Sequence, residues 1–164
     1  MKIFKILPAL VILLIQNISG ADEYFEQVKN NGQVVGCWNR INFPESAMKM
    51  MNKSEPYPLE HQWYCFLEDG RYFELHSNKD DNSSIKEKLK MMKIFPGQDY
   101  SLPREGVILI HHNETNQNTY WVISTVSKDV KLWGVDIKQG DMLMTIRHRN
   151  SEMDMYYRFM RRVM

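Results

Sequence analysis

Cys37 and Cys65 are the two cysteines of the chain, and they could form a disulfide, supply a thiol nucleophile or hold a metal ion. Neither lies in a CxxC motif, and neither has a histidine at the spacing of a metal site or a catalytic pair. In an oxidising compartment, an even pair of cysteines predicts a disulfide. We therefore expect Cys37 and Cys65 to be bonded to each other if the chain is exported.

The other reactive side chains form no recognisable catalytic or metal motif. The sequence contains no HExxH, Gly-x-Ser-x-Gly or P-loop motif and no carboxylate pair at glycosidase-like positions. His111 and His112 are consecutive, so in a strand they would point to opposite faces and could not hold one ion together. The run 80–82 lacks the glycine and the terminal glutamate of a calcium loop. We expect no catalytic residue, no metal and no cofactor, and we predict that the protein is not an enzyme.

Length and composition indicate one folded domain. The chain has 164 residues, with 21 Lys and Arg against 20 Asp and Glu, and this balance argues against a strongly basic nucleic-acid binder. Hydrophobic residues make up 43% and aromatic residues 12%, which is enough to build a buried core and argues against disorder.

Residues 1–21 have the three-part pattern of a secretory signal peptide. Lys2 and Lys5 precede an uncharged apolar run, and Ser19-Gly20-Ala21 is a small-x-small cleavage site. The alternative is a membrane anchor, but the run is shorter than the roughly 20 apolar residues that a span requires. We expect export to the periplasm or the extracellular space, no retained transmembrane anchor, and a mature domain over 22–164. Three sequons would be glycosylated only in a eukaryotic secretory pathway: Asn52, Asn82 and Asn113.

The mature sequence predicts short strands joined mainly by tight turns. The period-two segments rich in Val, Ile, Tyr, Trp or Met are 33–43, 61–68, 71–77, 105–113, 118–127, 129–138, 141–149 and 154–163. An eight-stranded antiparallel up-and-down β-barrel would leave these strands without an open edge. A two-sheet sandwich is the alternative, although it usually needs longer connections.

Two helices are expected beside these strands. One covers about 21–31, with Asp22 as a candidate N-cap. The other lies between the third and fourth strands, where Ser84 and Glu87 match a capping box and Pro96-Gly97 ends the helix. Because its amphipathic face needs an apolar surface, we expect the segment 83–95 to cover the barrel mouth.

Assumed turn lengths predict which side chains line the barrel interior. Two-residue turns at 69–70, 128–129 and 139–140 and a four-residue turn at 150–153 set the pairing of neighbouring strands. A one-residue error in a turn would reverse the faces of a strand. The aromatic and methionine residues predicted to face inward and to contact a ligand are Tyr64, Phe66, Phe73, Tyr120, Trp133, Met144, Tyr157 and Phe159. The same residues could instead form a closed core, because an apolar lining is needed in both cases.

A short motif at the start of the first predicted strand resembles the lipocalins and the wider calycin barrels. Gly36-Cys37-Trp38 matches their Gly-x-Trp sequence in an exported eight-stranded meander. The resemblance implies that Trp38 closes one end of the barrel and that an arginine near the last strand, here Arg161, packs across it. We therefore expect Trp38 and Arg161 to have structural roles.

If Trp38 faces inward, Arg40 does too, because side chains two positions apart in a strand share a face. A guanidinium inside a barrel is costly unless it meets a carboxylate, a phosphate or several acceptors. Arg40 could anchor the acidic head group of a ligand. It could equally pair with an acid of the protein or lie at the solvated mouth.

These features favour a binding protein over an enzyme. The first expectation is an exported lipocalin-like protein that binds a small apolar or amphipathic molecule inside the barrel. The alternative is a periplasmic or secreted protein-binding module, of the inhibitor or immunity type, with a packed barrel. An internal cavity would favour the first, whereas a packed interior with an exposed apolar loop would favour the second.

Overall fold

The computed structural model describes residues 21–51, 59–79, 82–147 and 155–164. Apart from Ala21, the predicted signal peptide lies outside the described residues, and so does Asn52. Asn82 and Asn113 are both exposed.

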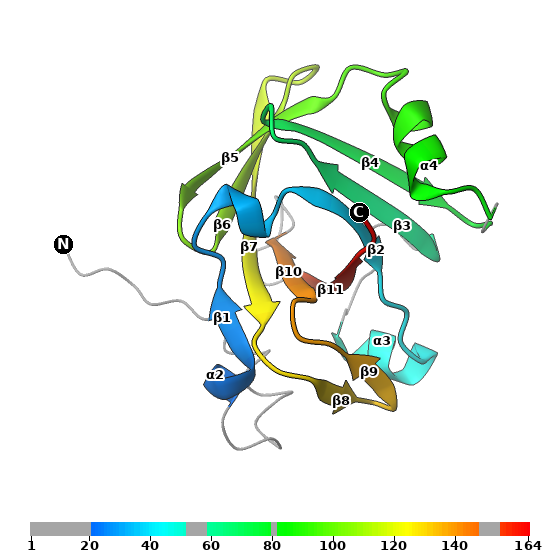
Figure 1. Ribbon diagram of the computed structural model, residues 1–164, viewed down its shortest axis with the longest axis vertical. Coiled ribbons are helices and arrows are strands. Elements are labelled where there is room, and N and C mark those ends of the chain that lie inside the picture. The colour runs from blue at the N-terminus through cyan, green and yellow to red at the C-terminus, as the bar shows by residue number, and fades with distance from the viewer. Residues whose placement is uncertain (1–20, 52–58, 80–81, 148–154) are drawn as a thin grey trace.

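Eight antiparallel strands close into a barrel (Figure 1), which confirms the predicted fold class. The pairing runs in the order β7-β10-β11-β2-β3-β4-β5-β6, and β6 returns to β7 to close the ring. The barrel strands are β2 (Gly36–Arg40), β3 (His61–Phe66), β4 (Arg71–Ser77), β5 (Gln98–Arg104), β6 (Val107–His112), β7 (Gln117–Val126), β10 (Met142–Arg147) and β11 (Met155–Arg162).

The interior of the barrel is filled by side chains from all eight strands. Alternate residues of each strand point inward and pack into one buried cluster. It contains four aromatic residues from β3, β4 and β5, together with aliphatic and methionine side chains from β6, β7 and β10. The cluster comprises Val28, Val34, Trp38, Tyr64, Phe66, Tyr72, Tyr100, Ile108, Ile110, Trp121, Ile123, Met142, Met144, Tyr156 and Met160.

Helix α4 (Ile85–Met92) covers the outer wall of the barrel. Its capping box is confirmed, since the Ser84 side chain accepts from the Glu87 N–H and the Glu87 carboxylate accepts from the Ser84 N–H. Met92 packs with Trp63 and Phe73 on the outer faces of β3 and β4, and Figure 1 shows α4 beside these strands. The expectation that this segment covers the barrel mouth is therefore wrong.

A second outer cluster lies between the barrel and two small elements. Helix α3 (Glu45–Met51) and the hairpin of β8 (Val130–Leu132) and β9 (Val135–Ile137) lie near each other in Figure 1. They pack against outward-facing residues of β7, β10 and β11. The buried members of this cluster are Phe43, Ala47, Val126, Leu132, Ile137, Leu143, Tyr157 and Phe159.

One predicted strand does not belong to the barrel, and one strand of the barrel was not predicted. The expected barrel strand over 129–138 is instead the separate β8–β9 hairpin, which turns at Trp133 and Gly134, both with positive φ. The eighth barrel strand is instead β5, which lies between β4 and β6 and was not predicted from the sequence. Pro103 and a register shift between Ser101 and Arg104 interrupt the alternation of β5.

The amino-terminal helix is shorter than expected. α2 (Ala21–Tyr24) is followed directly by β1 (Phe25–Gln27). β1 pairs with residues 124–126 of β7, past the part of β7 that pairs with β6. The 3-10 helix η1 (Asn31–Gln33) then leads the chain into β2.

The predicted register is wrong by one residue in two hairpins. The Leu67 N–H still donates to the Arg71 carbonyl, so the turn between β3 and β4 has three residues, 68–70. Phe66 therefore lies opposite Tyr72, and Phe73 faces outward. In the β10–β11 pair, Leu143 lies opposite Phe159 and Thr145 opposite Tyr157, which places both aromatic rings on the outer face. Because side chains alternate, each slip reversed the predicted faces of a whole strand.

Candidate ligand pocket at one end of the barrel

Trp38 lies at one end of the barrel interior and is held there by two contacts. Only 1% of its surface is exposed, and its indole N–H donates to the Val34 carbonyl beside η1 at 2.7 Å. The Arg162 guanidinium lies 4.7 Å from the centre of its ring, a cation–π contact. The arginine that packs across Trp38 is therefore Arg162, and the expectation of Arg161 is wrong. The pairing of β11 with β2 explains this contact, because it places Arg162 directly opposite Trp38.

A glycine is required at the first position of the Gly-x-Trp motif. Gly36 has φ +133°, which side chains rarely adopt, and a Cβ there would collide with the carbonyl oxygen of Met164. That carbonyl accepts from the Cys37 N–H at 2.9 Å. Gly36 thus lets the end of the chain close against β2, next to Trp38.

Arg161 points the other way and forms a bidentate ion pair with Asp141. Its Nε lies 3.0 Å from Asp141 Oδ1 and its Nη2 lies 2.7 Å from Oδ2. The Asp141 side chain is 4% exposed and also accepts from the Lys138 N–H at 2.8 Å. The hydrogen bond with Asp141 raises the pKa of Arg161 above its ordinary value. This pair fixes the turn 138–141 against β11.

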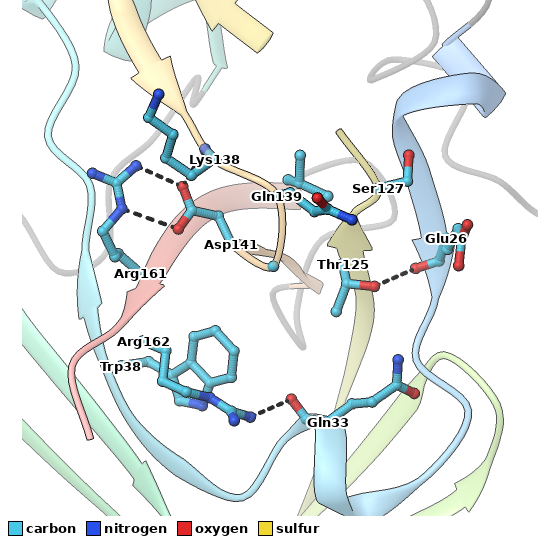
Figure 2. A pocket seen from close by; sticks show the side chains of 12 residues that line it. Glu26, Gln33, Trp38, Thr125, Ser127, Lys138, Gln139, Asp141, Arg161 and Arg162 are labelled. Atoms are coloured by element: carbon cyan, nitrogen blue, oxygen red, sulfur yellow. Dashed lines mark hydrogen bonds and ion pairs between the residues drawn. The ribbon is translucent and has the colours of Figure 1, made fainter. Parts of the chain in front are cut away.

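A pocket of about 700 Å³ opens between these groups. Figure 2 shows Arg161 and Asp141 on one side, Trp38 and Arg162 at the base, and Glu26 and Thr125 across from them. The walls are formed by β1, the end of β7, the turn before β10 and the end of β11. The complete lining is Glu26, Gln33, Trp38, Thr125, Val126, Ser127, Lys138, Gln139, Gly140, Asp141, Arg161 and Arg162.

The three cationic side chains of the pocket differ in how they are neutralised. Arg161 is paired with Asp141, and the Lys138 ammonium lies 3.0 Å from a carboxylate oxygen of Asp129. Arg162 donates through Nη2 to the Gln33 carbonyl at 2.9 Å and to the Gly32 carbonyl at 3.4 Å. Within the described part of the chain, no carboxylate side chain lies at ion-pair distance from Arg162.

Arg162 also keeps unused donors. A guanidinium carries five N–H groups, and the described contacts of Arg162 use only those on Nη2. The N–H groups on Nε and Nη1 therefore have no acceptor among the described residues. A carboxylate, sulfonate or phosphate oxygen is the acceptor that this fork binds best.

A buried polar network occupies another part of the barrel, and sequence reasoning missed it. Arg158 is 1% exposed, and its Nε donates to Gln62 Oε1 at 3.0 Å, while the Tyr64 hydroxyl donates to the same oxygen at 2.8 Å. Arg158 also donates to the Tyr157 carbonyl and lies over the Tyr156 ring. Burial raises the pKa of the Tyr64 hydroxyl. The alternation of side chains along β11 could have shown that Arg158 faces inward. The predicted β11 register was wrong by one residue, however, and placed Arg158 on the outer face.

The residues predicted to contact a ligand do not share one surface. Tyr64, Phe66 and Met144 lie inside the barrel, as expected. Arg40 is partly buried, and its Nη1 donates to the Leu59 carbonyl at 3.1 Å. Five residues lie elsewhere: Phe73, Tyr157 and Phe159 pack in the outer clusters, Tyr120 is 57% exposed on β7, and Trp133 lies in the β8–β9 turn.

Comparison with known proteins gives no family assignment: no protein-family model, curated protein or solved structure matches the chain. The closed eight-stranded barrel is compatible with a lipocalin-like fold. Across the described ranges, no helix is long and apolar enough to span a bilayer, and no group of three or more His, Cys, Asp or Glu side chains could hold a metal ion.

Proposed function

We propose that this protein is an exported binding protein that takes a small amphipathic anion into the pocket at the end of its barrel. The observation that carries the proposal is Arg162, a cation at the pocket base with unused donors and no carboxylate partner among the described residues. Its guanidinium would bind the anionic group of the ligand through Nε and Nη1.

The rest of the pocket supports a ligand with both polar and apolar parts. Its volume of about 700 Å³ suits a small organic molecule. The aliphatic stems of Lys138 and Arg161, which are partly exposed, offer apolar contact, while the Thr125 and Ser127 hydroxyls can meet polar groups of the ligand. The ion pair of Arg161 with Asp141 keeps the opposite wall rigid, so the pocket is largely formed before the ligand arrives.

The end pocket is favoured over the barrel axis because aromatic, aliphatic and methionine side chains fill the interior. Export is supported by the disulfide between Cys37 and Cys65, since such bonds persist in oxidising compartments.

Titration with 8-anilinonaphthalene-1-sulfonate tests the proposal, because this fluorescent probe joins a sulfonate to an aromatic body. We expect saturable binding, and Arg162→Gln should weaken it about tenfold or more, as expected for losing charge-assisted hydrogen bonds. The matched control is Arg104→Gln, an exposed arginine on β5, which should leave the affinity unchanged.

A further control separates this pocket from other apolar surfaces that could bind the probe. The double variant Ile94→Ser, Phe95→Ser removes the two most exposed large apolar side chains of the described residues. Binding that is insensitive to Arg162→Gln but lost in this double variant would refute the pocket.

A protein-binding module is the second candidate function. The filled interior and the exposed apolar loop at Ile94 and Phe95 are the features that this alternative requires. A stable complex with one protein of defined mass, purified from the host compartment, would favour it over a small ligand.

A further inference from the structure

The loop after α4 presents an apolar tip to solvent. Ile94 is 77% and Phe95 is 73% exposed, and Met91 extends the same surface. The geometry of the helix end explains the exposure: Met92 turns inward onto the outer wall of the barrel, while the N–H groups of Ile94 and Phe95 bond back to the last helical turn. The two apolar side chains therefore project beyond the helix.

An apolar groove of about 560 Å³ continues from this tip. Leu75 and Phe73 line it from β4, and the residues after α4 form its near wall. Glu114, from the turn between β6 and β7, lines its other side. The tip is thus the outer part of a larger apolar surface beside α4.

Three exposed lysines lie on the α4 side of the tip. Lys86, Lys90 and Lys93 are all exposed, and they lie on α4 or at its carboxyl end. The acidic residue among them, Glu87, is engaged in the capping box, where its carboxylate accepts from the Ser84 N–H and hydroxyl at 2.8 Å each. The α4 side of the tip is therefore positive, whereas Glu74 and Glu114 line the groove from β4 and from the turn between β6 and β7.

We propose that this lysine-flanked tip docks on an anionic lipid bilayer surface. Ile94 and Phe95 would enter the boundary between head groups and acyl chains, and Lys86, Lys90 and Lys93 would contact the lipid phosphates. The protein would then be held at the membrane surface without spanning it.

The composition of the tip favours a bilayer over an acidic protein. Protein interfaces are depleted in lysine and rely on Trp, Tyr and Arg anchors, none of which occurs from Ile85 to Pro96. A bilayer needs no matching pocket for two projecting side chains, and lysine stems can lie along the apolar boundary while their ammonium groups reach the head groups. The charge complementarity between the α4 lysines and anionic lipid therefore favours a bilayer as the partner of this surface.

This inference is independent of the end pocket, because the residues of the two surfaces do not overlap. Loss of membrane docking would leave probe binding at Arg162 unchanged. The converse also holds, so failure of one proposal is distinguishable from failure of the other.

Co-sedimentation with vesicles tests the proposal, using phosphatidylcholine alone and phosphatidylcholine mixed with phosphatidylglycerol. We expect binding to the mixed vesicles that weakens as salt is added. Ile94→Ser with Phe95→Ser should lower the partition coefficient at least about tenfold. Lys90→Gln and Lys93→Gln should each lower it about fivefold on the anionic vesicles alone. All variants carry the same amino terminus as the exported protein, so any difference in partition coefficient is due to the substitutions at the tip.

Two matched controls complete the experiment. Tyr120→Ser removes an exposed aromatic ring from β7, and Lys131→Gln removes an exposed charge from β8; neither should change the partition coefficient. Thermal midpoints equal to that of the native protein verify folding. If the tip variants partition like the native protein, or if they lose only the capture of an acidic host protein, the membrane proposal is wrong.

Discussion

Trp38→Ala is expected to lower the free energy of unfolding by about 3–5 kcal/mol, the largest effect of any single substitution discussed for this protein. The indole is fully enclosed, donates to the Val34 carbonyl and supports the Arg162 guanidinium. Its removal would leave a cavity at the closed end of the barrel and an unsatisfied carbonyl beside η1. Denaturant unfolding measures the loss, and the thermal midpoint should fall by roughly 10 °C or more.

The matched control is Tyr120→Ala, because this aromatic ring is 57% exposed and lies outside the barrel. Its effect should stay within about 0.5 kcal/mol. An equal effect of the two substitutions would show that Trp38 does not close the barrel.

Replacing both cysteines with alanine is expected to cost about 3–4 kcal/mol. The Cys37–Cys65 disulfide is confirmed, with a Cα–Cα distance of 4.1 Å between register partners on β2 and β3. Both residues lie on the outer face of the barrel, in the cluster that Met92 of α4 covers. The bond closes a loop with a sequence separation of 28, and the chain-entropy model converts that length into the stated free energy.

Thiol chemistry provides the control for this second prediction. The denatured, unreduced exported protein should have no reactive thiols, and reductant should lower the stability of the native protein to that of the double variant. Two reactive thiols per chain, or a double variant as stable as the native protein, would contradict the prediction.

The general architecture could be predicted from the sequence because it depends on short-range patterns. Period-two segments identified seven of the barrel strands, and the bounds of β4 were predicted to the residue. The capping box at Ser84 and the pairing of Cys37 with Cys65 likewise depend on local chemistry or on one antiparallel neighbour. Such patterns can be interpreted without knowledge of the whole fold.

The register could not be predicted because it depends on turn lengths that the sequence leaves ambiguous. Asp69-Gly70 suggests a two-residue turn, but the turn has three residues, 68–70, with Gly70 at φ +81°. The β8–β9 turn places Trp133 at positive φ, a conformation that a tryptophan does not signal in advance. The β3–β4 slip moved Phe73 from the outer wall to the predicted interior, and the separate β10–β11 slip did the same for Tyr157 and Phe159.

For the same reason, the candidate pocket could be predicted only in part from the sequence. The Gly-x-Trp motif identified Trp38, and the need for an arginine across it was correct, but the slipped β11 register selected Arg161 instead of Arg162. The partners of Arg161 and Lys138 come from distant turns, so no local pattern could show which cation stays unpaired.

Native mass spectrometry of the protein purified from its own host compartment tests the proposed function most directly. The native protein should retain a small anionic molecule at one copy per chain, and Arg162→Gln should lose it while Arg104→Gln keeps it. A small molecule retained equally by the native protein and by Arg162→Gln, or a bound protein partner with no small molecule, would contradict the proposed function.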